Sequence, residues 1–319
     1  MTVTLSVNTL EKKLQQTIAD INGKSAELIQ RYGLTIDALK GKRIALIGGP
    51  AVGKGTIVSL LKEDIAQNYP KTQPAIVEFS KALFAYCARN PSDDEKIRKE
   101  RMEKGKLVPD YFVNKIFQQD VLPFVETESQ KDTTFATFYD GIPRTEDQVH
   151  AIQDFGVLPQ IAVMFKAKPL VLEHRMYLRN LGLLLSDRKP RDDAMNKERA
   201  QKRIEEFEHN YRPLRNALKE YDTHIIDVSA ERGPHAVYLE MIALLSDPKN
   251  SLFFNERDAE FEEINRLSRE YMHDNLIRTF AQGKELLQRD PAKLELADGL
   301  AILAKKASDK LYSCKYDLK

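Results

Sequence analysis

The sequence predicts an α/β fold, in which a five-stranded parallel sheet is covered by helices on both faces and carries helical N- and C-terminal extensions. Two observations lead to this prediction. Five short apolar runs alternate with segments of helical periodicity between residues 43 and 228, and a glycine-rich turn follows the first of these runs directly. Such alternation is typical of parallel sheets, because each connection between parallel strands has to cross a face of the sheet.

The glycine-rich turn, RIALIGGPAVGKGT over residues 43–56, has the features of a phosphate-binding loop. Its glycines allow backbone N–H groups to turn around an anion at the N-terminus of a helix that begins near Gly53. Lys54 adds positive charge for the phosphates, and the hydroxyl of Thr56 suits a magnesium ion. Compared with the strict Walker A pattern, Gly55 is inserted between the two. The residues expected to bind nucleotide here are Gly48, Gly49, Ala51, Val52, Gly53, Lys54, Gly55 and Thr56.

A second motif, ATFYDGIPRTEDQ over residues 136–148, begins as an apolar strand and ends in polar residues. Asp140 closes the strand, where a parallel sheet can present a carboxylate to Mg²⁺ beside the phosphate loop. Gly141 allows close backbone approach, and Arg144 can donate two N–H groups to a phosphate. Gln148 carries an amide that can recognise the edge of a base. The two motifs together predict a site for phosphorylated ligands.

The spacings G-x-P-x-x-G-K-G-T and D-G-x-P-R-x-x-x-Q resemble those of the nucleoside monophosphate kinases, adenylate kinase above all. The resemblance covers roughly residues 41–246. It implies a P-loop NTPase-like core with an acceptor-binding insert near residues 80–112 and a short lid near residues 180–195. The implied reaction moves the γ-phosphoryl of ATP, bound with Mg²⁺ at Thr56 and Asp140, to a nucleoside monophosphate. AMP is the favoured acceptor, so that ATP and AMP give two ADP.

The acceptor-binding segment between EFSKALF and MEKGKLVPDYFV has the spacing that the family has there. The acceptor residues that the resemblance implies are Ser80, Met102, Lys106, Leu107, Val108, Gly141, Arg144 and Gln148. The family's phosphate-binding arginine is replaced by Ala85, and Arg89 lies one helical turn later. Ile142 also replaces an aromatic residue of the family pattern.

Arginines bracket a proline-containing turn in the predicted lid. Arg175 and Arg179 are four residues apart and so share one helical face, and Arg203 opens the next helix. Pro190 stands at a family arginine position, which leaves Arg188 and Arg191 as candidates. With Lys54 and Arg144, the resemblance implies that Arg175, Arg179, Arg191 and Arg203 neutralise the transferring charge. It also places Ser229, in the loop after the fifth strand, beside the donor adenine.

The predicted organisation is an N-terminal helical extension over residues 1–40, the kinase core over residues 41–248 and a C-terminal helical extension over residues 249–319. The first extension is one amphipathic helix or a helical pair divided at Gly23, ended by Gly33. The last contains two helices, the second after Pro291. Neither shows a spacing that indicates chemistry, so we expect packing or self-association there, with regulation as an alternative.

The amino-acid composition limits the classes of partner that we expect for this protein. The 319 residues have a formal net charge of +1, which argues against nucleic acid or a membrane surface as the main partner. Cys87 and Cys314 are too few for a disulfide framework, and no apolar run suggests a membrane span or a leader, so we expect a cytoplasmic protein. Two alternatives stay open: a UMP or CMP kinase, and a nucleotide-binding regulatory or structural domain with reduced or no turnover.

Overall fold

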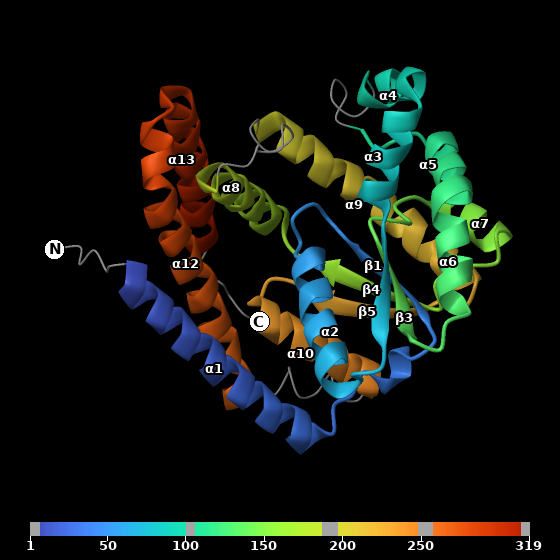
Figure 1. The fold of residues 1–319 in the computed structure, drawn as a ribbon, viewed down its shortest axis with the longest axis horizontal. Helices are drawn as coiled ribbons and strands as arrows, with labels where there is room; N and C mark the ends of the chain where they lie inside the picture. The colour runs from blue at the N-terminus through green and yellow to red at the C-terminus, as the bar shows by residue number, and fades with distance from the viewer. Residues whose placement is uncertain (1–6, 100–105, 187–196, 248–257, 314–319) are drawn as a thin grey trace.

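The centre of the structure is a five-stranded sheet in the order β2-β3-β1-β4-β5, with every neighbouring pair parallel (Figure 1). This computed structural model describes residues 7–99, 106–186, 197–247 and 258–313. The strands are β1 (Arg43–Gly48), β2 (Gln73–Glu78), β3 (Thr134–Asp140), β4 (Ile161–Lys166) and β5 (His224–Ser229). The predicted fold class is confirmed. Strand β2 ends at Glu78, because Phe79 already begins the next helix.

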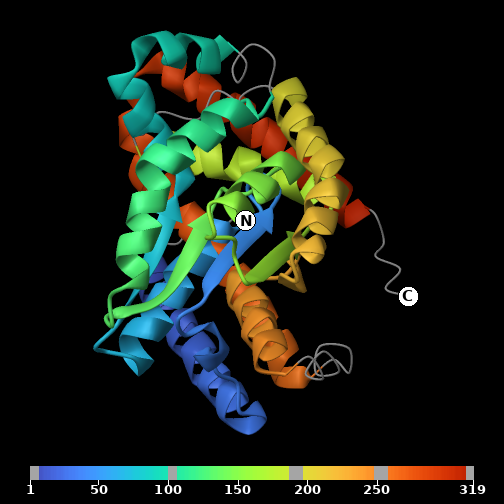
Figure 2. The same cartoon turned by 90° about the vertical axis from the view of Figure 1, so that its right-hand side faces the viewer.

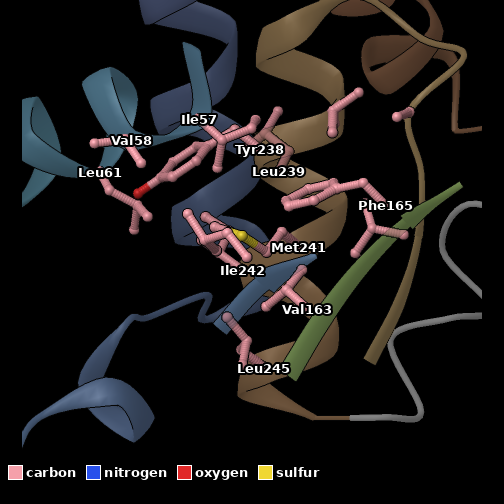
Figure 3. Close-up of a cluster of buried hydrophobic side chains, with 14 of the residues drawn as sticks. Ile57, Val58, Leu61, Val163, Phe165, Tyr238, Leu239, Met241, Ile242 and Leu245 are labelled. Carbon is pink, nitrogen blue, oxygen red and sulfur yellow. The ribbon is translucent and has the colours of Figure 1, made fainter. Parts of the chain in front are cut away.

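Alternate residues of β1 enter two different hydrophobic cores. Ile44 and Leu46 pack with α2 (Lys54–Asn68) and α10 (Pro234–Ser246), as Figure 3 shows for the side chains that these helices share with β4. Ala45 and Ile47 face the opposite core, which contains α7 (Glu146–Asp154) and part of α9 (Lys197–Glu220). Because side chains of a strand alternate between faces, a continuous apolar strand is what a doubly covered sheet requires.

The segment between β2 and β3 forms a helical insert (Figures 1 and 2). Its elements are α3 (Phe79–Arg89), α4 (Pro91–Arg98), α5 (Asp110–Ile116), the π-helical turn η3 (Phe117–Val121) and α6 (Leu122–Ser129). Buried side chains of α3, α4 and α5 join the same core as Ala45 and Ile47. The start of this insert lies directly after β2, so its first turn is held at the carboxyl edge of the sheet.

The terminal helices pack against each other beside the core (Figure 1). They are α1 (Val7–Tyr32), α12 (Ala259–Gln288) and α13 (Pro291–Ser313). Helix α1 runs through Gly23 without a break and ends before Gly33, whose φ is +60°. It is joined to α12 by Lys13, which lies 2.8 Å from both Glu270 and Asp274. Helix α13 lies along α8 (Pro169–Leu185), the helix that follows β4.

Three further findings concern the residues that the structure describes. The 3₁₀ turn η1 (Asp37–Leu39) connects α1 to β1. None of the described helices combines the length and the apolar character that crossing a membrane demands. The thiol of Cys87 is buried in the insert, whereas Cys314 lies outside the described residues.

Candidate functional site

The glycine-rich turn connects β1 to α2 and closes around its own lysine. Gly53 precedes the helix with a φ of 110°, a conformation that residues with a side chain rarely adopt. A Cβ atom at Gly48 would lie 2.8 Å from Cγ1 of Val52, so the close turn needs glycine there as well. Lys54 Nζ donates to the carbonyl oxygens of Gly48, at 2.7 Å, and Gly49, at 3.3 Å. The N-terminus of α2 and the Lys54 ammonium thus lie at one point, as an anion site requires.

Electrostatics at Lys54 show which charged groups surround it. The pKa of Lys54 is lowered to about 8, mainly by burial and then by the positive charge of Arg144, while the Asp140 carboxylate opposes this shift. Arg203 and Arg179 also lower this pKa. Side chains from α2, α8, α9 and the loop after β3 therefore gather around the same lysine. Four cationic groups and one carboxylate form a site that favours a multiply charged anion such as a nucleoside triphosphate.

The motif after β3 is held by the side chain of Gln148. Its Oε1 accepts from the backbone N–H of Arg144 at 2.7 Å, and its Nε2 donates to Asp110 of α5 at 2.7 Å. Arg144 Nε donates to the Gly141 carbonyl oxygen at 2.8 Å. Gln148 is only 2% exposed, so this network fixes Arg144 and the start of α5 relative to each other.

Arg175 joins two loops that are far apart in the sequence. Its guanidinium donates to the carbonyl oxygens of Val52 in the glycine-rich turn and Arg232 in the loop after β5, both at 3.2 Å. Burial is the main cause that lowers the pKa of Arg175. The loop after β5 is also held from within, because Glu240 of α10 accepts from the Ser229 N–H and pairs with Arg232.

One cavity of about 2110 Å³ connects these groups. A site for one small molecule usually occupies about 300–1,000 Å³, so this cavity has room for two nucleotides. The predicted residues that line it are Gly48, Gly49, Ala51, Val52, Gly53, Lys54, Gly55, Thr56, Ser80, Lys106, Leu107, Val108, Asp140, Gly141, Arg144, Gln148, Arg175, Arg179, Arg203 and Ser229. Met102, Arg188 and Arg191 lie outside the described residues.

Comparison with known proteins finds adenylate kinases. The chain is 27% identical over 138 residues to "Adenylate kinase" of Lactococcus lactis subsp. cremoris, a match that spans 42% of this chain and 57% of that protein. It is 24% identical over 229 residues to "Adenylate kinase, chloroplastic" of Zea mays, covering 66% of this chain and 96% of that protein. These similarities support membership of an adenylate kinase-like family.

The extent of these matches differs between relatives. A Flavobacterium psychrophilum adenylate kinase is 31% identical over 112 residues, which cover 35% of this chain and 51% of that protein. The chain thus spans about half the length of several curated relatives that it matches. No family model matches the chain.

Two basic residues of α3, Arg89 and Lys81, lie near Ala85 in the sequence, where the family has an arginine. The Arg89 guanidinium binds both carboxylate oxygens of Asp120, at 2.6 and 2.7 Å, and does not line the cavity. The ammonium of Lys81 pairs with Glu78 at 2.7 Å and does not line the cavity either. Neither side chain therefore borders the cavity in which we expect an acceptor phosphate.

The proposed magnesium ligands fit that ion in chemistry and position. Asp140 stands opposite Leu46 of β1, and Thr56 lies in the first turn of α2, so both border the phosphate loop. Mg²⁺ prefers oxygen ligands and takes one or two from the protein while the remainder come from phosphates and water. Among the described residues no group of three or more His, Cys, Asp or Glu side chains could hold a metal.

The family resemblance did not indicate that α12 would border the cavity. Asn265 and Arg269, in the C-terminal extension, line the same cavity as the glycine-rich turn. No motif in the sequence marks these residues, because their position depends on how α12 packs against α10 and the loop after β5.

Proposed function

We propose that this protein is an ATP-dependent nucleoside monophosphate kinase that transfers the γ-phosphoryl group of ATP to AMP, giving two ADP. The observation that carries this proposal is the position of Lys54, which lies at a helix N-terminus and within the electrostatic reach of Arg144, Arg179, Arg203 and Asp140. A cluster of cations around one point stabilises the charge of a phosphoryl group in transfer.

The reaction requires no covalent intermediate on the protein. A phosphate oxygen of the acceptor attacks the γ-phosphorus, and the bond from that phosphorus to the bridging oxygen breaks as ADP leaves with the electron pair. Lys54 and the backbone N–H groups of the turn hold the donor phosphates. Arg144, Arg179 and Arg203 stabilise the negative charge of the phosphoryl group as it moves from donor to acceptor. Arg175 orients the donor side, and Arg191 belongs to the same proposed set. Mg²⁺, bound through Thr56 and Asp140, supplies further charge neutralisation.

The acceptor base is proposed to contact Gln148, with Ser80 and the segment around Lys106 and Val108 on its other side. An amide has two N–H donors and two acceptor lone pairs, and the structure uses one of each on Asp110 and Arg144. The remaining donor and acceptor suit the edge of adenine, which offers N1 and an amino group. AMP is therefore the preferred acceptor in this proposal.

A second candidate function follows from Ala85. An acceptor site without the family's arginine would bind any monophosphate less tightly, which favours a nucleotide-binding domain with reduced or no turnover. The other alternative is that UMP or CMP is the better acceptor. The described hydrogen bonds of Gln148 go to protein groups, so they do not select one base over another.

A coupled assay that measures ADP formation from ATP and a panel of AMP, UMP, CMP and GMP distinguishes these possibilities. We expect ADP release that depends on the monophosphate and is fastest with AMP. Faster release with UMP or CMP would assign the enzyme to that acceptor. Binding of ATP without ADP release for any acceptor would replace the kinase proposal by the regulatory one.

A further inference from the structure

The loop after β5 is held by the C-terminal extension as well as by the core. Asn265 Oδ1 of α12 accepts from the Gly233 N–H at 2.9 Å, and Ser268 Oγ accepts from the His235 N–H at 3.2 Å. Arg269 donates to the Glu231 carbonyl oxygen at 3.0 Å. Ser268 is fully buried and Asn265 is 8% exposed, so the hydrogen bonds of these two side chains are shielded from water. Three backbone groups between residues 231 and 235 are thus held by one helix.

Gly233 permits the close approach of this loop to α12. A Cβ atom at Gly233 would lie 2.7 Å from Cβ of Ser268 and 3.0 Å from the Asn265 carbonyl oxygen. Contacts that short do not occur in folded proteins without a shift of one partner. The absence of a side chain at Gly233 therefore belongs to the contact between the loop and α12.

The same loop forms a wall of the proposed donor site. Arg175 connects the carbonyl oxygen of Arg232 in this loop to that of Val52 in the glycine-rich turn, so the two loops are separated by one guanidinium. A nucleotide whose phosphates lie at Lys54 would have its base between Arg175 and the segment from Ser229 to Gly233. Asn265 and Arg269 line this part of the cavity themselves.

Helix α8, which carries Arg175, also rests on the C-terminal extension. Leu181, Leu184 and Leu185 of α8 pack with Leu287, Ala297 and Leu300, and the His174 ring donates to the Ala304 carbonyl oxygen at 3.0 Å. A Cβ atom at Gly283 of α12 would lie 2.2 Å from the Leu185 carbonyl oxygen, so α12 crosses the end of α8 in direct contact. Both sides of the proposed base pocket are therefore supported by residues after 258.

We propose that α12 is a structural part of the donor-base pocket, in which Asn265 and Ser268 act as positioning residues for the loop that contacts the base. This inference rests on the proposed function, because it needs the cavity to bind a nucleoside triphosphate at Lys54. It assigns the C-terminal extension a role in recognising the donor, beyond packing or self-association.

The test compares two ligands, of which one carries a base and the other does not. Calorimetry would measure the dissociation constants of ATP and of inorganic tripolyphosphate for the full chain and for Asn265→Leu and Ser268→Ala. Because each variant leaves a buried N–H without its acceptor, we expect the dissociation constant of ATP to rise about tenfold. Tripolyphosphate binds only at the glycine-rich turn, so its dissociation constant should stay unchanged. A general loss of stability would weaken both ligands.

Two further variants serve as controls. Asn265→Asp keeps an acceptor oxygen for Gly233 and should bind ATP more like the unmodified protein than Asn265→Leu does. Asp274→Asn removes the contact of α12 with Lys13 of α1, at a distance from the loop, and should leave both dissociation constants unchanged.

The outcomes separate this inference from the proposed function. If the unmodified protein binds ATP, and Asn265→Leu and Ser268→Ala either match it or weaken ATP and tripolyphosphate equally, the role of α12 is wrong while the kinase proposal stands. If the unmodified protein binds neither ligand, the nucleotide site itself is wrong, and the role of α12 fails with it.

Discussion

The donor and acceptor sides of the cavity are built differently. The donor side combines a glycine-rich turn that matches the family spacing with a loop that α10 and α12 hold by hydrogen bonds on two sides. The acceptor side depends on a helical insert, and it lacks the family's arginine at Ala85. Gln148 is one of the residues that connect this insert to the core, because it joins Asp110 to Arg144.

This difference shows which part of the proposed function is best supported. In the proposed function, binding of the ATP phosphates would depend on backbone geometry and on several charges, so the loss of one group elsewhere should not remove it. Recognition of the acceptor depends on few side chains, and one of those expected from the family is missing. Variants on the two sides should therefore differ in size of effect and in which ligand they affect.

The largest effect is expected from Lys54→Ala on the donor side. Removal of one group that stabilises a transition-state charge typically lowers turnover by about 10²–10³-fold. Steady-state ADP formation measures this loss, and circular dichroism should show an unchanged fold because Lys54 contacts loop carbonyls. Lys62→Ala, an exposed position on the same helix, is the matched control. Normal turnover by Lys54→Ala would show that the phosphate site lies elsewhere.

A smaller and more selective effect is expected from Gln148→Ala on the acceptor side. Loss of a buried hydrogen bond costs about 1–3 kcal/mol, which corresponds to roughly one to two orders of magnitude in the preference for AMP over UMP. The measurement is kcat/KM for each acceptor. Thr145→Ala is the control, because Thr145 also bonds Asp110 but has no proposed contact with a base. An unchanged order and ratio of acceptors in Gln148→Ala would remove Gln148 from base recognition.

A fall in pH should destabilise the packing of the C-terminal helices beside the proposed donor site. Burial lowers the pKa of both His174 and His235 from the ordinary value of 6.5, and both contact these helices. The unfolded chain takes up these protons first, so the free energy of unfolding should fall as pH drops below 6.5 toward the lower folded-state pKa values. Urea unfolding between pH 5 and pH 8 measures this, with the range set by the reference pKa of histidine.

The control for the acid effect is the double variant His174→Gln and His235→Gln. Its free energy of unfolding should depend less on pH below 6.5 than that of the unmodified chain. Equal slopes in the two proteins would show that these histidines are not responsible.

The smallest effect is expected from Arg89→Ala. The structure pairs Arg89 with Asp120 at an exposed surface, where such ion pairs contribute about 0–1 kcal/mol to stability. The KM values of all monophosphates should therefore stay unchanged in steady-state assays. A uniform rise in these KM values would show that Arg89 reaches the acceptor phosphate during the reaction and compensates for Ala85.

The sequence was most informative where backbone conformation limits the choice of residue. The turn around Gly48 and Gly53 and the strand that ends in Asp140 could be predicted because glycine spacing and apolar runs have direct geometric causes. The two C-terminal helices could also be predicted from their periodicity. Most site residues that were proposed from these loops and strands line one cavity.

Other features depended on contacts between distant segments. Arg89 could not be assigned from its place one turn after Ala85, because its orientation follows from Asp120, which is 31 residues away. The position of Asn265 beside Gly233 depends on the packing of α12 and has no local signal. Gln148 was predicted to bind a base, yet the structure also uses it to hold Arg144. The sequence motif does not reveal this contact between the Gln148 amide and the backbone.

In the proposed function, one cavity aligns two nucleotides so that a phosphoryl group moves between them. ATP with a radioactive γ-phosphate can be mixed with unlabelled AMP and Mg²⁺. The measurement then identifies the product that carries the radioactive label. We expect the label in the β-phosphate of newly formed ADP, and a transfer slower by about 10²–10³-fold in Lys54→Ala. Label released only as inorganic phosphate, or retained entirely in ATP, would show that no phosphoryl group moves between two nucleotides.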